Sequence, residues 1–404
     1  MNGQRLSLSL AVIIGLAAGP MNAAQAQGLF RSSTGSICEP AKEAGVKPVR
    51  RTLLYVDKQA LSLSPDEQEW FGAVNQMLQQ TMTTAEPLDI VVLDSAKGTA
   101  KAHGSTLCYP VIEERYHDRF AGSGISGLLT NDLIDQLPDL KKEITVQMQD
   151  QVGPGYADAP QQRRQSKAED IGKRHLLRAL QSDAARFGGD LPTRVILYSD
   201  MIDNSDLVDL NAVLSGDDEQ RLNSATSAID DLPRLDFQGA MVYGFGTAAA
   251  LKNPVAADAL NGFMQQVVYL SNGYPGDFSR ELSVPAIRPE SVAQYDMEVT
   301  VEERTFKGRM QLMKGDNGRL TDSFLDLGTD NRSAHFTSGR LICSQDNSCQ
   351  LEGKLATALL FEDPENVFLE GSQDTLSGHL GFRNDRLADS DNPALLPIEA
   401  EVRP

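Results

Sequence analysis

Positive charge is scarce in this 404-residue chain, which carries 37 Lys and Arg against 56 Asp and Glu and a formal net charge of −19 at pH 7. Nucleic acids and anionic membranes are bound through clustered cationic side chains, so this balance argues against both as partners. With 41% hydrophobic and 23% charged residues, the composition is that of an ordinary globular protein and excludes disorder throughout. The length predicts two domains.

The motifs of several enzyme classes are missing. The chain has no GxSxG nucleophile elbow, no HExxH zinc motif and no GxxxxGK[ST] phosphate loop. Its five histidines share no spacing typical of metal ligands. The glycine-rich run at 122–127 matches none of these motifs and is interpreted as a loop. We therefore expect the protein not to be an enzyme.

An apolar run of 13 residues stands at 6–18, after Arg5 and before the small residues Ala24 and Ala26. This pattern is typical of a secretory signal peptide, here with cleavage before Gln27. A membrane-spanning helix needs about 20 apolar residues, and an N-terminal anchor is the alternative. We expect residues 1–26 to be a signal peptide and the mature protein to be periplasmic or extracellular, exported by a prokaryote and not inserted in a membrane.

Cysteine is also rare, since the four residues Cys38, Cys108, Cys343 and Cys349 allow only three pairings. Cys343 and Cys349 flank a polar turn between two strand-like runs, so their spacing favours a bridge that leaves Cys38 to pair with Cys108. In the chain-entropy model the short and the long loop give roughly 2 and 4 kcal/mol of stabilisation. A zinc site built from four such scattered cysteines is the alternative.

Strand-like and helix-like segments alternate between residues 50 and 280. Apolar, β-prone runs stand at 52–57, 88–94, 107–112, 193–200 and 239–246. Helical patterns stand at 66–81, 131–151, 162–187 and 254–270, the middle two separated by a Gly-Pro-Gly loop. Continuous apolar strands joined by helices predict a three-layer α/β domain with a mainly parallel sheet, preceded by an extension at 27–49.

The pattern changes at 285–404, where short β-like segments are divided by Gly, Asn and Asp. Turn signals every 8 to 12 residues are typical of antiparallel all-β domains. We expect a β-rich, β-sandwich-like domain here, with a small barrel as the alternative.

Three strand-like runs resemble those of von Willebrand factor A (VWA) domains. The run at 195–200, VILYSD, resembles the fourth strand of that family, which commonly ends in Ser-Asp-Gly. The runs at 52–57 and 241–246 resemble the first strand and the strand after the fourth. The resemblance covers residues 50–272 and leaves the C-terminal half unexplained. It implies a VWA/Rossmann-like sheet with a metal-ion-dependent adhesion site.

That adhesion site takes Asp-x-Ser-x-Ser after the first strand, a Thr from a later loop and the Asp after the fourth strand. Asp57 and Asp200 match, whereas Gln59 and Leu61 stand in place of the two serines, and no Thr is placed. The resemblance therefore implies a degenerate site. No cofactor is expected, and Mg²⁺ would be held only weakly if nearby serines or backbone carbonyls completed its shell.

A third carboxylate belongs to the same edge of the predicted sheet. The strand order 3-2-1-4-5 places Asp94, Asp57 and Asp200 at the carboxyl ends of three neighbouring strands, within roughly 10 Å of one another. Carboxylates so close repel one another unless a cation, Lys58 or water intervenes. Either they bind a cation, or each caps a loop and accepts backbone N–H bonds.

These observations lead us to expect an exported, non-enzymatic protein-binding protein that serves adhesion or assembly in the cell envelope and has a protein partner. The alternative is a metal-dependent hydrolase on a Rossmann-like sheet that uses Asp57 and Asp200. A structural subunit with an inactive site is the third hypothesis. A hydrolase needs a concave pocket beside these acids, whereas a binding module presents an open edge.

Overall fold

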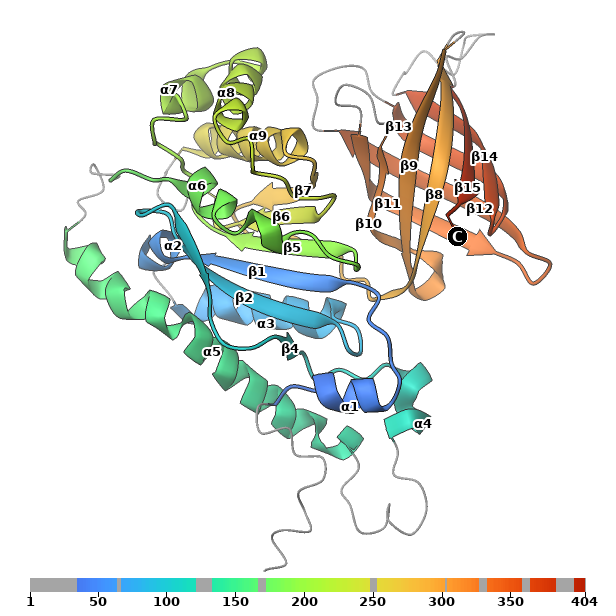
Figure 1. The fold of residues 1–404 in the computed structure, drawn as a ribbon, viewed down its shortest axis with the longest axis horizontal. Coiled ribbons are helices and arrows are strands. Elements are labelled where there is room, and N and C mark those ends of the chain that lie inside the picture. Colours follow the sequence, from blue (N-terminus) through green and yellow to red (C-terminus); the bar gives the residue numbers. More distant parts are fainter. Residues whose placement is uncertain are drawn as a thin grey trace, which may run out of the picture.

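A computed structural model of the chain describes residues 35–63, 67–120, 133–165, 172–247, 253–301, 304–326, 333–357, 364–382 and 396–403. The predicted signal peptide and the glycine-rich run at 122–127 lie outside these ranges. Figure 1 shows a layered α/β part beside a barrel of long strands. No helix in the described ranges is long and apolar enough to cross a membrane.

The α/β part is built on one seven-stranded sheet with the order β3-β2-β1-β5-β6-β7, in which β4 also pairs with β2. The pairs among β2, β1, β5, β6 and β7 are parallel, and β3 and β4 run antiparallel to β2. This confirms the predicted mainly parallel sheet. The strands are β1 (Arg51–Asp57), β2 (Pro87–Asp94), β3 (Thr99–Ala102), β4 (Leu107–Cys108), β5 (Thr193–Tyr198), β6 (Met241–Phe245) and β7 (Tyr274–Ser279).

Helices cover both faces of this sheet. Successive side chains of a strand point to opposite faces, so each central strand contributes apolar residues to two helical layers. Leu53 and Tyr55 of β1 pack in a core with α6 (Leu176–Gln181), α7 (Leu210–Ser215), α8 (Asp218–Asp230) and α9 (Pro254–Leu270). Leu54 and Val56 pack on the other face with α2 (Lys58–Leu63), α3 (Glu67–Thr81) and α5 (Leu133–Gln165). The result is the three-layer arrangement that the sequence predicts.

The helical region between β4 and β5 differs from the prediction. α5 continues to Gln165 through the Gly-Pro-Gly run, which we expected to be a loop between two helices. Ile144, Met148 and Val152 recur every four residues and are buried against the sheet, so tertiary packing carries the helix into this run. Among the described residues of the second predicted helix, at 162–187, the first belong to the end of α5, and the later ones form α6 and the short 3-10 helix Ala184–Arg186.

Both predicted disulfides are confirmed. Cys38, the first residue of α1 (Cys38–Glu43), is bonded to Cys108 of β4, and the backbone N–H of Ile37 donates to the carbonyl of Cys108. Cys343 and Cys349 are bonded across an antiparallel strand pair. The first bridge therefore ties the segment before β1 onto the sheet. Disulfides of this kind persist in oxidising compartments.

The C-terminal part is a closed antiparallel barrel with the order β10-β11-β12-β13-β14-β15-β8-β9, so the predicted β-sandwich is wrong. β8 pairs with both β9 and β15, and β9 pairs with β10, which closes the sheet on itself and leaves no free edge. The strands are β8 (Pro289–Val301), β9 (Arg304–Gly315), β10 (Leu320–Asp326), β11 (Ser333–Cys343), β12 (Ser348–Thr357), β13 (Pro364–Ser372), β14 (Thr375–Phe382) and β15 (Leu396–Val402).

The barrel contacts the sheet through several side chains of β9 and β10. The Tyr274 hydroxyl of β7 donates a hydrogen bond to Asp326 at 3.0 Å, and the ring of Phe324 stacks on that of Tyr274.

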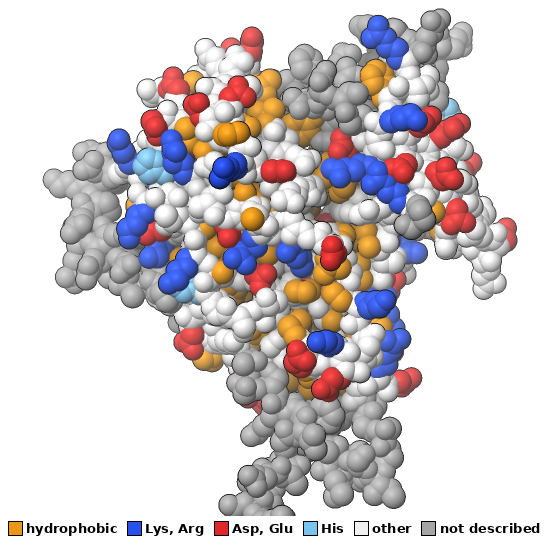
Figure 2. Space-filling view, in the orientation of Figure 1, with side chains coloured by type: hydrophobic (Ala, Val, Ile, Leu, Met, Phe, Trp, Pro, Cys, Tyr) orange, Lys and Arg blue, Asp and Glu red, His pale blue; other side chains and the backbone are white. Residues whose placement is uncertain are grey.

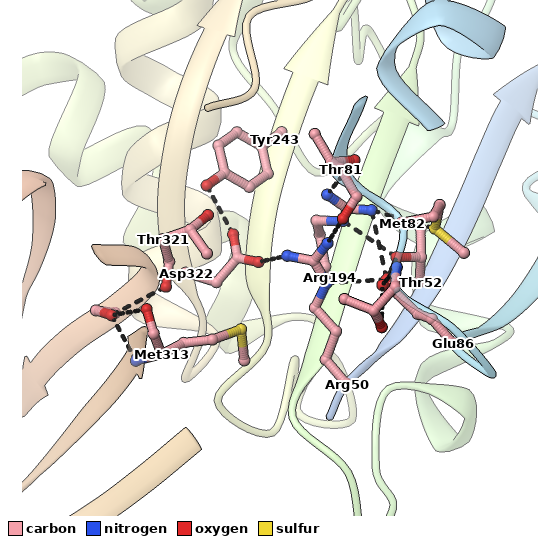
Figure 3. A network of polar contacts seen from close by, with 12 residues as sticks. Arg50, Thr52, Thr81, Met82, Glu86, Arg194, Tyr243, Met313, Thr321 and Asp322 are labelled. Atoms are coloured by element: carbon pink, nitrogen blue, oxygen red, sulfur yellow. Dashed lines mark hydrogen bonds and ion pairs between the residues drawn. The ribbon is translucent and has the colours of Figure 1, made fainter. Parts of the chain in front are cut away.

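A further contact comes from Asp322. The register of β10 shifts between Thr321 and Phe324, and Asp322 within this bulge has a left-handed φ of 45°. The bulge directs the Asp322 carboxylate toward the sheet, where it accepts hydrogen bonds from Arg50 and, at 2.8 Å, from the Tyr243 hydroxyl (Figure 3).

Arg50 belongs to a fully buried ionic network at the amino-terminal edge of the sheet. Its Nε donates to Oε1 of Glu86 at 2.8 Å, and Arg194 lies 3.4 Å from the same oxygen. Burial alone would raise the pKa of Glu86, but the two guanidinium groups outweigh it and lower that pKa. Burial, with Arg50 beside it, lowers the pKa of Arg194 to about 10. The barrel therefore docks at the edge opposite to the carboxyl ends of β1 and β5.

Candidate functional site

The acidic residues singled out in the sequence lie at the carboxyl-terminal edge of the sheet. Asp57 is the last residue of β1, Asp94 is the last residue of β2, and Asp200 follows β5 by two residues. β2, β1 and β5 are neighbours in the sheet. The side chains of Asp57 and Asp200 are fully buried, whereas that of Asp94 is partly exposed.

Asp57 is held by donors from three segments. Its Oδ1 accepts hydrogen bonds from Ser95 Oγ at 2.9 Å and from the backbone N–H of Gln59 at 3.1 Å. Its Oδ2 accepts from Ser199 Oγ at 3.1 Å. Burial is the largest influence on Asp57 and raises its pKa, and these hydrogen bonds oppose the rise. The carboxylate is therefore fixed by the protein in a single orientation.

Asp200 faces a guanidinium that the sequence analysis does not assign to the site. Nη2 of Arg174 lies 3.6 Å from Oδ2 of Asp200, beyond hydrogen-bond distance. Nη1 of the same group donates to Oε1 of Gln59 at 2.6 Å. The backbone N–H of Arg174 is in turn held by the side chain of Asn204. One internal cation thus bridges Asp200 and the residue that stands in place of the first serine of the adhesion motif.

The donors at this edge do not fit a Mg²⁺ ion bound in octahedral geometry. Oε1 of Gln59 is occupied by Arg174, and Leu61 is buried in the apolar core between the sheet and α3. Both oxygens of Asp57 already accept hydrogen bonds. Among the described residues, no group of three or more His, Cys, Asp or Glu is arranged to hold a metal ion. The guanidinium supplies the positive charge that two buried carboxylates require.

Asp94 is engaged by lysines at the surface of the same edge. Its Oδ2 lies 3.8 Å from Nζ of Lys58 and 3.3 Å from Nζ of Lys97. Lys58 is therefore a neighbour of Asp94, as the sequence analysis allows. The carboxylate of Asp94 lies in a lysine-rich surface, whereas those of Asp57 and Asp200 lie beneath it.

Asp200 is expected to make the stability of the protein depend on pH. Burial raises its pKa from 3.8 to about 7, and the charge of Asp57 adds to the rise. Because the folded state binds this proton more tightly than the unfolded state, the contribution of Asp200 to stability falls as the pH rises from about 4 to about 7, by up to about 1.4 kcal/mol per pH unit. Denaturant unfolding across this range measures the slope.

The isosteric Asp200→Asn variant is the control, because it cannot ionise at this position. The wild type should lose stability relative to this variant as the pH rises between these two values. Equal slopes for the two proteins would contradict a raised pKa at Asp200.

Comparison of the sequence with models of known protein families and with curated proteins finds no match. The strand order and directions are compatible with a VWA-like or Rossmann-like sheet.

Arg174 is the site residue that the sequence analysis missed. It lies in the segment before α6, far along the chain from both Asp57 and Asp200, and no motif marks it. The signal available in the sequence is indirect, since two acids at neighbouring strand ends require a cation from some other segment. Ser95 was missed in the same way, because a serine one residue after a strand is common.

Proposed function

We propose that the protein is an exported, non-enzymatic protein-binding protein of the cell envelope, active in adhesion or assembly. Its VWA-like domain binds a partner at the carboxyl-terminal edge of the sheet without a metal ion. The observation that carries the proposal is the position of Arg174, whose guanidinium lies between Asp200 and Gln59 where an adhesion site of this family would hold a cation.

Burial of the two acids supports a binding function over a hydrolase. A metal-dependent hydrolase needs carboxylates that reach a cation and a substrate in an open pocket. The side chains of Asp57 and Asp200 are 0% exposed, and both oxygens of Asp57 accept hydrogen bonds from the protein itself. Neither carboxylate is presented to a substrate.

The domain arrangement supports the same edge as the binding surface. The barrel contacts the amino-terminal edge through Asp322 and the start of β7 through Tyr274, and the carboxyl ends of β2, β1 and β5 lie away from the barrel (Figure 1). Ligands of open α/β sheets bind at the carboxyl ends of the strands. Export is supported by the signal-like run at 6–18 and by the two disulfides.

Affinity capture from a prokaryotic envelope extract, with the mature chain as bait, tests this function. The bait is compared with and without EDTA, and with an Ala96→Trp variant that places a bulky neutral side chain on the exposed turn after β2. Ile342→Trp, at an exposed position of β11 in the barrel, is the matched control. We expect one captured protein to persist in EDTA and with Ile342→Trp, and to be lost with Ala96→Trp.

Two results would contradict the proposal. Loss of the captured protein in EDTA would show that binding needs a metal ion. Equal capture by Ala96→Trp and the wild type would place any binding surface elsewhere on the molecule.

A further inference from the structure

The junction between the barrel and the sheet keeps charged side chains away from solvent. Over the face shown in Figure 2, Lys and Arg side chains lie among Asp and Glu side chains at the surface. The charges of the junction differ, because each of their residues is at most 4% exposed. These residues are Arg50, Glu86, Arg194 and Asp322. Charges that are removed from water need partners within the protein, so this network has to be balanced locally.

The α/β part contributes more positive than negative charge to this network. It provides the guanidinium groups of Arg50 and Arg194, and both of these groups approach the carboxylate of Glu86. The second carboxylate of the network is that of Asp322, which belongs to β10 of the barrel and pairs with Arg50. The barrel therefore supplies the counter-charge that balances the amino-terminal edge of the sheet.

Two donors of the α/β part converge on the Asp322 carboxylate, one on each oxygen. Nη1 of Arg50 donates to Oδ2, and the Tyr243 hydroxyl donates to Oδ1 at 2.8 Å (Figure 3). Burial raises the pKa of Tyr243 well above its usual value, and the charge of Asp322 adds to the rise, so the hydroxyl keeps its proton. A guanidinium and a hydroxyl placed in this way recognise a carboxylate. We call Arg50 and Tyr243 the carboxylate site.

The barrel adopts an unusual backbone conformation to reach the carboxylate site. Asp322 has a φ of 45°, in the left-handed region, and lies within the bulge of β10. This region is uncommon for residues other than glycine, although asparagine and aspartate tolerate it better than most. Such a conformation persists where the surrounding contacts compensate for its cost. The contacts of the Asp322 carboxylate with Arg50 and Tyr243 provide this compensation.

We propose that Arg50 and Tyr243 form a carboxylate-binding site of the α/β part, which takes a small free monocarboxylate when the Asp322 side chain is absent. In the intact protein the barrel fills this site as a tethered ligand. The carboxylate site is separate from the carboxyl-terminal edge of the sheet, where we propose that a partner binds. Docking of the barrel is thus a binding step within the chain that depends on a carboxylate.

Chemical rescue of Asp322→Gly tests the inference on the mature chain. Glycine accepts the left-handed backbone, and the substitution removes a side chain that acetate matches in size and charge. Thermal unfolding at neutral pH is compared in sodium acetate and in sodium chloride of equal ionic strength. We expect acetate to raise the folding equilibrium constant of this variant, by about tenfold when its concentration is about nine times its dissociation constant.

Asp322→Asn is the matched control, because its amide fills the same space and asparagine tolerates the left-handed backbone. Acetate should stabilise this control no more than it stabilises the wild type. Acetamide, the neutral counterpart of acetate, should not restore Asp322→Gly. Adding Tyr243→Phe to Asp322→Gly removes one donor of the carboxylate site and should raise the dissociation constant of acetate about tenfold.

Two results would overturn the inference. The first is stabilisation of Asp322→Gly by acetate that does not exceed the stabilisation of Asp322→Asn. The second is equal rescue by acetamide, which would show that filling the space is enough. If Asp322→Gly does not fold in chloride, the fraction that refolds from denaturant is measured in acetate and in acetamide. A larger folded fraction in acetate supports the carboxylate site, and equal fractions overturn it.

Discussion

Replacing Arg174 by alanine is expected to lower the free energy of unfolding by about 3–5 kcal/mol at a pH well above the pKa of Asp200, where this carboxylate is ionised. The variant leaves Asp57 and Asp200 buried side by side without their shared counter-charge, and Oε1 of Gln59 loses its donor. Removing one partner of a buried ion pair is costly, because the other charge stays desolvated. Denaturant unfolding of the wild type and the variant measures the difference.

Arg178→Ala is the matched control for this experiment. Arg178 lies one helical turn along the chain, but its side chain is 41% exposed and its pair with Asp206 lies in solvent. We expect this control to change stability by less than about 0.5 kcal/mol. A similar loss for both variants, or a negligible loss for Arg174→Ala, would contradict the role of Arg174 as an internal cation.

Replacing Glu86 by alanine is expected to have a comparable effect, with a loss of about 3–5 kcal/mol. Glu86 is fully buried and accepts hydrogen bonds from Arg50 at 2.8 Å and from Thr52 at 2.6 Å. In the variant, the buried guanidinium groups of Arg50 and Arg194 repel each other, because the carboxylate of Glu86 that both approach is gone. Thermal or denaturant unfolding, followed by circular dichroism, measures the loss.

The control for Glu86→Ala is Glu352→Ala, because Glu352 is exposed on the outside of the barrel. This substitution should leave stability within about 0.5 kcal/mol of the wild type. Asp322→Ala extends the test to the junction, since it removes the carboxylate that the barrel contributes. Stability of Glu86→Ala equal to that of Glu352→Ala would contradict a structural role for the network.

The α/β architecture was predictable because its strands are long apolar runs. Residues 52–57 and 88–94 are apolar on both faces of the sheet, and only parallel strands covered by helices bury such runs. The edge strand β3 was not predicted, because its sequence TAKA is short and exposed and has no apolar alternation. Local sequence therefore predicts the centre of the sheet better than its edge.

Closure of the barrel was not predictable from the spacing of turns. Tyr295, Met297 and Val299 alternate with exposed residues along β8, and this alternation is the same for a sandwich and for a barrel. A sandwich and a barrel differ in whether the first and last strands pair with each other. This pairing joins β8 and β15, which are far apart in the sequence. Such long-range pairing leaves no local signal.

Only the acidic residues of the candidate site were predictable from the sequence. Asp57 and Asp200 follow apolar strands, so their place at one edge followed from the expected strand order. Arg174 reaches them from a separate segment, and its role depends on tertiary contacts with Gln59 and Asp200. The acids therefore identify where the site lies. The contacts of Arg174 identify how the negative charge of these acids is balanced.

Calorimetric titration of the mature chain with Mg²⁺, Mn²⁺ and Ca²⁺ tests most directly whether Arg174 serves as the cation of this site. Asp57→Ala and Asp200→Ala are titrated beside the wild type. With the guanidinium in place, we predict no saturable heat for the wild type with any of the three ions. Saturable binding by the wild type that is lost in both folded variants would contradict an internal cation and assign a metal to this edge of the sheet.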